Sequence, residues 1–237
     1  MVLDIQPRAV WHFSGDAIDT LSPTHQAKVQ LEGGPGADTL DGGAGSDFVS
    51  LLNSSVPQTL NLANLSLSSP IHALDTLISV ENVLGVQGHS NTITGDNAAN
   101  VLIAGDQADL VAGGGGADVL VTALGDDTLD GGGGVDVFLG GLGDDAHTGG
   151  AGADLFLFED DGQDVITDFT IADGDRLLFF GPVTAYGDLA FSTDGNGDAV
   201  VSYGADPLAL STVTVLGVTQ AELDPTPGVQ PGHILIA

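Results

Sequence analysis

The chain has no cysteine in its 237 residues, so it can form neither a disulfide framework nor a thiolate metal site. Basic side chains are also scarce: 3 Lys and Arg stand against 33 Asp and Glu, for a formal charge of −30. This balance disfavours nucleic acids and anionic membranes as partners and favours cations. Without cysteine, the ligands that remain for a cation are mainly hard oxygen atoms.

Long apolar runs and aromatic side chains are missing as well. No stretch approaches the roughly 20 consecutive apolar residues of a membrane span, and residues 1–15 lack the basic-then-apolar pattern of a cleaved signal peptide. Aromatic residues make up 5% of the chain while glycine contributes 36 residues, which argues against a thick, close-packed interior. We expect one elongated body without a membrane span.

A nine-residue repeat occupies the middle of the chain. Its polar positions are Asn91, Asn100, Asp109, Asp118, Asp127, Asp136, Asp145 and Asp154. Two residues later come Ile93, Leu102, Val111, Leu120, Leu129, Phe138, His147 and Phe156, and paired glycines precede most units. The pattern Gly-Gly-x-Gly-x-Asp-x-apolar-x is a known signature of calcium-binding parallel β-structure. The conformations and charges of these residues explain why they suit such a structure.

Each unit divides into a turn and a short strand. Glycines supply the positive φ angles of a sharp six-residue turn, and the middle residue of the following three-residue strand points inward. Successive units reverse direction, so two units make one coil and alternate turns stack at about 4.8 Å. The predicted fold is therefore all-β: a parallel β-roll, a right-handed β-helix of glycine-rich nonapeptide repeats, with capping segments at both ends.

Stacked turns create a ladder of like charges. Carboxylates about 5 Å apart repel by roughly 1 kcal/mol in water and several times more at an effective dielectric near 20. A cation between turns reverses this effect, and carboxylates with turn carbonyls suit Ca²⁺, which takes 6–8 oxygens, better than Mg²⁺. We predict several calcium ions, with ligands from Asp38, Asp47, Asn100, Asp109, Asp118, Asp127, Asp136, Asp145, Asp154, Gly114, Gly116, Gly132, Gly134, Gly150 and Gly152.

Stacking of alternate units also predicts which carboxylates are neighbours. Strong sites are expected at Asp109/Asp127, Asp127/Asp145, Asp118/Asp136 and Asp136/Asp154, and a weaker one at Asn100/Asp118. Asp38 and Asp47 anchor further sites whose partners the pattern does not assign. Since inward residues gain roughly 1.5–3 kcal/mol each against about 1–2 kcal/mol of backbone entropy per residue, we expect folding to depend on calcium.

The chain divides into three segments on this pattern. Residues 1–32, which hold Trp11 as an expected end plug, form an N-terminal cap. Residues 33–158 form the calcium-binding roll, with a stretch at 51–90 that we expect to continue the coil through degenerate turns. Residues 159–237 form a C-terminal β cap. His147, at an inward position, is expected to be a core histidine hydrogen-bonded within the roll.

At this point the sequence resembles the RTX, or haemolysin-type calcium-binding, family. The resemblance rests on GGPGADTLDGGAGSD, DTLISVENVLG followed by NTITGDNAANVL, GGAGADLFLF, and DVITDFTIADGDRLLFF. These stretches are similar to C-terminal regions of serralysin-type proteases and to repeat modules of alginate epimerases. The resemblance implies an extracellular or cell-surface calcium-binding module, exported by type I secretion machinery through an uncleaved signal in the C-terminal segment, where TVTVLGVTQAELD and HILIA are similar to such ends.

No catalytic motif accompanies the repeats. The zinc protease motif HExxH is absent, and Gly88-His89-Ser90 lacks the glycine of a nucleophile elbow, since Thr92 stands in its place. We therefore expect a secreted, non-catalytic calcium-binding module rather than an enzyme. Two alternatives stay open: a polysaccharide-binding or adhesive module, and the C-terminal fragment of a larger secreted protease or epimerase.

The two predicted sheets differ in their outward residues. One presents Val101, Ile103, Val119, Val121, Val137, Leu139, Leu155 and Leu157, whereas the other presents Thr92, Thr94, Leu110, Ala112, Thr128, Asp130, Ala146 and Thr148. A contiguous apolar patch is usually covered or an interaction site. We expect the first sheet to be covered, by residues 177–180 and 213–218 of the chain itself or by a second copy or partner.

Overall fold

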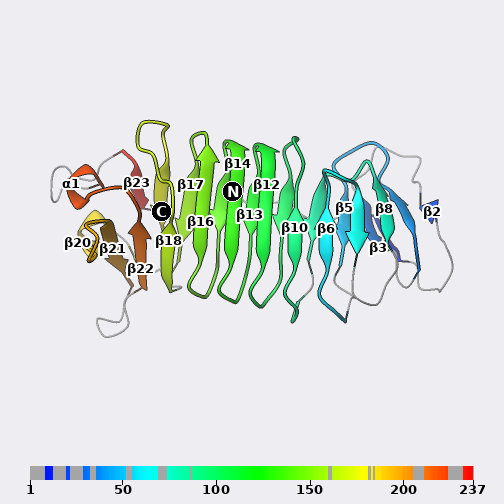
Figure 1. The fold of residues 1–237 in the computed structure, drawn as a ribbon, viewed down its shortest axis with the longest axis horizontal. Coiled ribbons are helices and arrows are strands. Elements are labelled where there is room, and N and C mark those ends of the chain that lie inside the picture. The colour runs from blue at the N-terminus through cyan, green and yellow to red at the C-terminus, as the bar shows by residue number, and fades with distance from the viewer. Residues whose placement is uncertain are drawn as a thin grey trace.

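A computed structural model of the protein describes residues 9–12, 20–21, 29–32, 36–51, 55–68, 74–85, 87–159, 162–180, 183, 185–204, 211–223 and 232–236. The chain forms a parallel β-roll, as predicted: short strands alternate between two sheets that stack along one long axis (Figure 1). We call the 10-stranded sheet A and the 13-stranded sheet B.

Sheet A is parallel throughout the described strands. In spatial order it contains β1 (Ala9–His12), β3 (Val29–Glu32), β5 (Phe48–Ser50), β9 (Asn82–Leu84), β11 (Val101–Ile103), β13 (Val119–Val121), β15 (Val137–Leu139), β17 (Leu155–Phe158), β19 (Arg176–Phe179) and β23 (Ile234–Ile236).

Sheet B faces it across the core. In spatial order it contains β2 (Thr20–Leu21), β4 (Thr39–Asp41), β8 (Asp75–Ile78), β7 (Ser66–Ser68), β6 (Thr59–Asn61), β10 (Thr92–Thr94), β12 (Leu110–Gly116), β14 (Thr128–Gly134), β16 (Ala146–Ala151), β18 (Gln163–Ile166), β22 (Ser211–Val215), β21 (Ala199–Tyr203) and β20 (Ala190–Thr193). A 3-10 helix, η1 (Tyr186–Asp188), and one short helix, α1 (Gln220–Leu223), lie at the C-terminal end.

The register in the repeat region shows the two-unit coil directly. Leu110 pairs with Thr128 and Val119 with Val137, so stacked positions are 18 residues apart. The middle residue of each three-residue strand is buried, and its apolar side chain fills the narrow space between the sheets. Each unit thus contributes one inward side chain to the core. The aspartate two residues earlier lies where the turn meets the strand, at the edge of the core.

The stretch at 51–90 corrects one prediction. β9 continues sheet A in parallel, and β6 and β8 pair in parallel with β10 and β4 of sheet B, but β7 lies between them, so β6, β7 and β8 form an antiparallel meander. After β6 the chain reverses in a tight turn in which Leu65 has a φ of 58° and its amide donates to Leu62 O. The paired glycines that shape the crossover turns are missing here, which explains the change of topology.

Both ends of the roll are built from further strands. The described part of residues 1–32 supplies β1, β2 and β3, which extend the two sheets, whereas the side chain of Trp11 lies outside the described residues. At the other end, β18 and β19 add to sheets B and A. There Phe158, Phe179 and Tyr203 pack together, with ring centroids 5.0–6.2 Å apart.

The expected cover of sheet A by the C-terminal segment is wrong. Residues 177–179 lie in β19 and residues 213–215 in β22, so both extend the sheets edgewise instead of crossing the outer face. The eight apolar residues predicted to face outward from sheet A are half-buried, and their ladders continue into Leu84, Leu178 and Leu235. Sheet A therefore carries a continuous outer strip of apolar side chains, which we call the apolar strip.

Candidate metal centre

The turn carboxylates form two rows, one at each side of the roll. The residues just before the sheet A strands make the A row, with Asn100, Asp118, Asp136 and Asp154, and those just before the sheet B strands make the B row, with Asp109, Asp127 and Asp145. All seven are buried. The stacking thus brings together the neighbours that the sequence pattern pairs.

One oxygen of each aspartate is committed to the backbone of the adjacent coil. In the A row the amide of Asp118 donates to Oδ1 of Asp136 at 2.8 Å, and the amide of Asp136 donates to Oδ1 of Asp154 at 2.9 Å. In the B row the amide of Asp109 donates to Oδ1 of Asp127 at 2.7 Å. These bonds fix the carboxylates in rotamers that stack along the roll.

In four of these aspartates the other oxygen lacks a protein donor. The Oδ2 atoms of Asp118, Asp127, Asp136 and Asp154 are buried without a hydrogen bond from the protein. Arg176 is the only Lys or Arg within the described residues, and its side chain is exposed at the end of the sheet A ladder. Burying a carboxylate oxygen without a donor or a cation is costly, so these four atoms fit a bound cation.

The first glycine of each turn makes room for this oxygen. A Cβ added to Gly131 would lie 2.5 Å from Oδ2 of Asp136, and one added to Gly113 would lie 2.5 Å from Oδ2 of Asp118. Carboxylate oxygen and turn backbone therefore share a space that any side chain would fill. A hard divalent ion such as Ca²⁺, which accepts carboxylate and carbonyl oxygens in flexible geometry, suits this donor set.

The six glycines predicted as carbonyl ligands all have positive φ angles: Gly114, Gly116, Gly132, Gly134, Gly150 and Gly152. The requirement is sharpest at Gly134, whose φ is 143° and where an added Cβ would lie 1.3 Å from the carbonyl oxygen of Gly116. Each turn carbonyl thus points at the glycine of the next turn. The close approach leaves no room for a side chain between stacked turns.

Without a metal ion, the buried aspartates of the two rows are harder to ionise than ordinary aspartates. Burial raises the pKa of Asp109 to about 6, with a further contribution from the charge of Asp127. Burial likewise raises the pKa of Asp154 to about 6, with contributions from Asp175 and Asp136. The pKa of Asp136 is raised by the same two causes, burial first and then neighbouring aspartates. An ion between the turns would supply the positive charge that these groups lack.

Turns that depart from the repeat pattern differ in structure. Asn100 already uses its amide, since Nδ2 donates to Glu81 O at 2.7 Å and Oδ1 accepts from the Asp96 amide at 2.9 Å. Gln107 occupies a glycine position with a φ of 80°, and the Thr122 hydroxyl donates to Gly140 O. In these turns, polar side chains therefore occupy or bond to positions that glycine and aspartate hold in the regular repeat.

The structure supplies partners for the two isolated aspartates. The amide of Asp38 donates to Oδ1 of Asp75 at 2.8 Å, and the amide of Asp47 donates to Oε2 of Glu81 at 2.9 Å. The same backbone-to-carboxylate contact therefore recurs where the glycine repeat is interrupted. Burial raises the pKa of Asp75 to about 6, with a further contribution from the charge of Asp38.

The nine-residue pattern did not identify two members of the rows near the C-terminal end. Asp164 accepts from the amide of Asp145 and Asp175 from the amide of Asp154, each at 3.0 Å, so both rows gain a member. Their offsets are 19 and 21 residues instead of 18, which hides them from a strict nine-residue search. The remaining signal is an aspartate two residues before an inward apolar residue, here Ile166 and Leu177.

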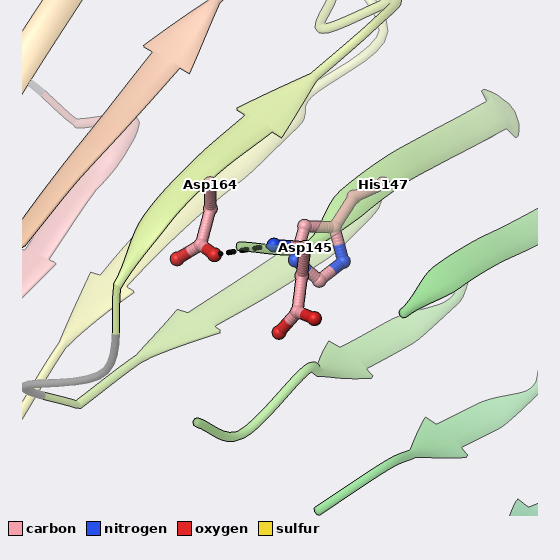
Figure 2. A group of neighbouring side chains, drawn as sticks. All are labelled: Asp145, His147 and Asp164. Carbon is pink, nitrogen blue, oxygen red and sulfur yellow. Dashed lines mark hydrogen bonds between the residues drawn. The ribbon is translucent and has the colours of Figure 1, made fainter. Parts of the chain in front are cut away.

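His147 lies in the core beside the B row. As expected it is buried, with 1% of its surface exposed, but the expected hydrogen bond is absent at Nδ1. Burial lowers the pKa of the imidazole to about 4, so it is neutral at physiological pH. Figure 2 shows its ring beside the carboxyl groups of Asp145 and Asp164.

The comparisons with known proteins agree with the repeat. Four copies of the RTX calcium-binding nonapeptide repeat match residues 30–51, 87–120, 112–146 and 121–156. No curated protein shows a significant sequence match. Among the described residues, no helix is long and apolar enough to cross a membrane.

Two solved structures illustrate the similarity. The AlgE6R2 subunit of the Azotobacter vinelandii mannuronan C5-epimerase is 27% identical over 61% of this chain and 92% of its own, with a TM-score of 0.32. The extracellular lipase LipA from Serratia marcescens is 16% identical over 93% of this chain, with a TM-score of 0.30. This chain spans only 37% of the lipase's length.

Proposed function

We propose that this chain, which carries RTX calcium-binding nonapeptide repeats, is a secreted, non-catalytic module whose roll folds on binding several calcium ions outside the cell. The observation that carries this proposal is the set of four buried Oδ2 atoms, on Asp118, Asp127, Asp136 and Asp154, that have no protein donor. They recur along both rows at the places where the repeat pattern puts its ions.

The ions lie between successive turns in this proposal. Each is held by carboxylates of neighbouring coils and by turn carbonyls, including those of Gly114, Gly116, Gly132, Gly134, Gly150 and Gly152. The neighbouring pairs are Asp118/Asp136 and Asp136/Asp154 in the A row, and Asp109/Asp127 and Asp127/Asp145 in the B row. Asp38 and Asp47 hold further ions with Asp75 and Glu81, which their hydrogen bonds bring close.

Coupling of folding to calcium follows from the charge balance. Without ions, each row stacks carboxylates about 4.8 Å apart and buries them, so the folded state carries repulsion that the extended chain avoids. Extracellular calcium modules commonly bind in the range of about 10⁻⁴–10⁻³ M. The chain would then stay unfolded at cytosolic calcium levels, which suits export through type I secretion machinery, and fold outside.

Ion counting tests this proposal. Equilibrium dialysis of the full chain at extracellular calcium concentrations should find several ions per chain. Asp118→Asn and Asp136→Asn should each reduce the count or weaken the uptake, whereas Asp126→Asn, at an exposed position, should not. Failure of the wild-type chain to retain calcium would contradict the proposal.

The apolar strip supports a second role, self-association. Seven sheet A strands align Leu84, Ile103, Val121, Leu139, Leu157, Leu178 and Leu235 in one ladder. We propose that two calcium-loaded rolls pack through this strip, because a contiguous apolar face is usually an interaction site. In sedimentation, Val121→Asp or Leu139→Asp should shift a dimer to monomer, while Thr128→Asp on sheet B should not. A wild-type chain that is monomeric at all concentrations would refute this role.

A further inference from the structure

One group of side chains differs from the calcium rows in chemistry. Asp145 and Asp164 are adjacent members of the B row, and His147 lies two residues after Asp145 on β16 (Figure 2). One imidazole nitrogen and one carboxylate oxygen from each aspartate lie within 4.8 Å of one another. Within the described residues, this is the group in which a histidine joins carboxylates at metal-ligand spacing.

His147 occupies a position that the fold gives to apolar side chains. Its register neighbours on sheet B are Leu129 and Ile166, both fully buried. The imidazole is buried and makes no hydrogen bond at Nδ1, so it costs free energy that a leucine at the same position would not. Core packing therefore gives no reason for a histidine here.

The surrounding rings hold the imidazole in place. The centroids of Phe138, Phe156 and Phe158 each lie 6.0 Å from that of His147, in edge-to-face arrangements. A metal-bound histidine usually gains its orientation from a hydrogen bond at its second nitrogen. Here packing against three aromatic rings fixes the ring instead, and leaves it directed at the two carboxyl groups (Figure 2).

The donor set selects the class of ion. Calcium prefers oxygen ligands throughout, whereas one imidazole nitrogen with two carboxylate oxygens suits a borderline divalent ion such as zinc or cobalt. Two donor atoms bound to one tetrahedral zinc ion at about 2.0–2.1 Å are roughly 3.4 Å apart, so donors that lie within 4.8 Å of one another need to close by at most about 1.4 Å.

We propose that Asp145, His147 and Asp164 bind one zinc-class divalent ion, at a site separate in selectivity from the calcium sites of both rows. The ion takes the place of calcium between Asp145 and Asp164. It therefore pins β16 to β18 at the point where the regular repeat ends and the spacing of the B row changes from 18 to 19 residues.

Cobalt(II) in saturating calcium provides the test, because its visible absorption reports on nitrogen ligation. The full chain should bind one cobalt ion with a spectrum of mixed nitrogen and oxygen ligands, and zinc should displace it. His147→Leu, which matches the leucines of the inward row, should lower cobalt affinity at least about 10-fold, the smallest loss expected when even an outer partner of a metal ligand is removed. Circular dichroism should show His147→Leu folded in calcium.

Two further variants keep the result interpretable. His89→Leu removes an imidazole from a loop outside the group and should leave cobalt binding unchanged. Asp164→Asn retains the Oδ1 acceptor for the Asp145 amide but loses a charged ligand, so it should stay folded and bind cobalt more weakly. Cobalt binding that is equal in wild type and His147→Leu, or that is absent from calcium-loaded wild type, would overturn the proposal. Either outcome would leave the proposed calcium-binding function intact, because calcium binding is measured separately.

Discussion

Neutralising the central A-row carboxylate should change stability in opposite directions with and without calcium. Asp136 lies between Asp118 and Asp154, is fully buried, and receives the Asp118 amide at Oδ1. Asp136→Asn keeps an Oδ1 acceptor for this bond and removes one negative charge. In chelator the variant should be more stable than wild type, and in calcium it should be less stable.

The size of the effect follows from the stacking distance. Charges about 4.8 Å apart repel by about 1 kcal/mol in water and about 3.5 kcal/mol at an effective dielectric of 20. Asp136 has two such neighbours, so the substitution should stabilise the metal-free roll by at least about 2 kcal/mol. In calcium, two ion sites lose a charged ligand, and the calcium midpoint for folding should rise at least about 10-fold.

Two titrations measure these quantities. The osmolyte concentration needed to fold chelator-treated protein reports the metal-free stability, since excluded osmolytes favour compact states. A calcium titration followed by circular dichroism gives the midpoint. Asp126→Asn is the matched control, because Asp126 is exposed in the turn before Asp127 and its Oδ1 contact to the Asp144 amide can be retained. If Asp136→Asn destabilised the protein in chelator and calcium alike, the repulsion argument would be refuted.

Two further predictions concern the turns and pH. Gly134→Ala places a Cβ 1.3 Å from Gly116 O and should lower the free energy of unfolding of the calcium-loaded roll, measured in urea, by more than about 3 kcal/mol. The control Gly133→Ala places its Cβ where no atom lies within 4 Å and should change the free energy of unfolding little. Equal effects of the two substitutions would contradict the turn geometry. Asp109 and Asp154 have folded pKa values of about 6, above the unfolded value of about 3.9, so lowering the pH from 7 to 5 should stabilise the metal-free fold and weaken calcium binding. At pH 5 less osmolyte should therefore fold chelator-treated protein, whereas the calcium midpoint for folding should rise; shifts in the other directions would contradict the pKa argument.

The repeat made the central part of the fold predictable. Since an aspartate at every ninth position fixes two units per coil, the 18-residue register, the inward residues and the two rows all follow from spacing alone. The outward apolar strip followed from the same alternation. Its cover did not, because residues 177–179 and 213–215 are equally suited to extend a sheet as to cross it.

Positions where the spacing changes were beyond this reasoning. The meander of β6, β7 and β8 depends on a local reversal at Leu65, which no glycine marks. Asp164 and Asp175 are displaced by one and three residues from the repeat, yet they reach the same rows because the intervening loops absorb the extra length. Periodicity therefore identifies stacked ligands only while the loop length stays constant.

The central claim is that calcium and folding form one equilibrium. Titration of calcium into chelator-treated protein, followed by far-ultraviolet circular dichroism and sedimentation on the same samples, tests it most directly. The account predicts a cooperative gain of strand signal together with compaction. Full strand signal and a compact sedimentation coefficient already present in chelator would contradict it.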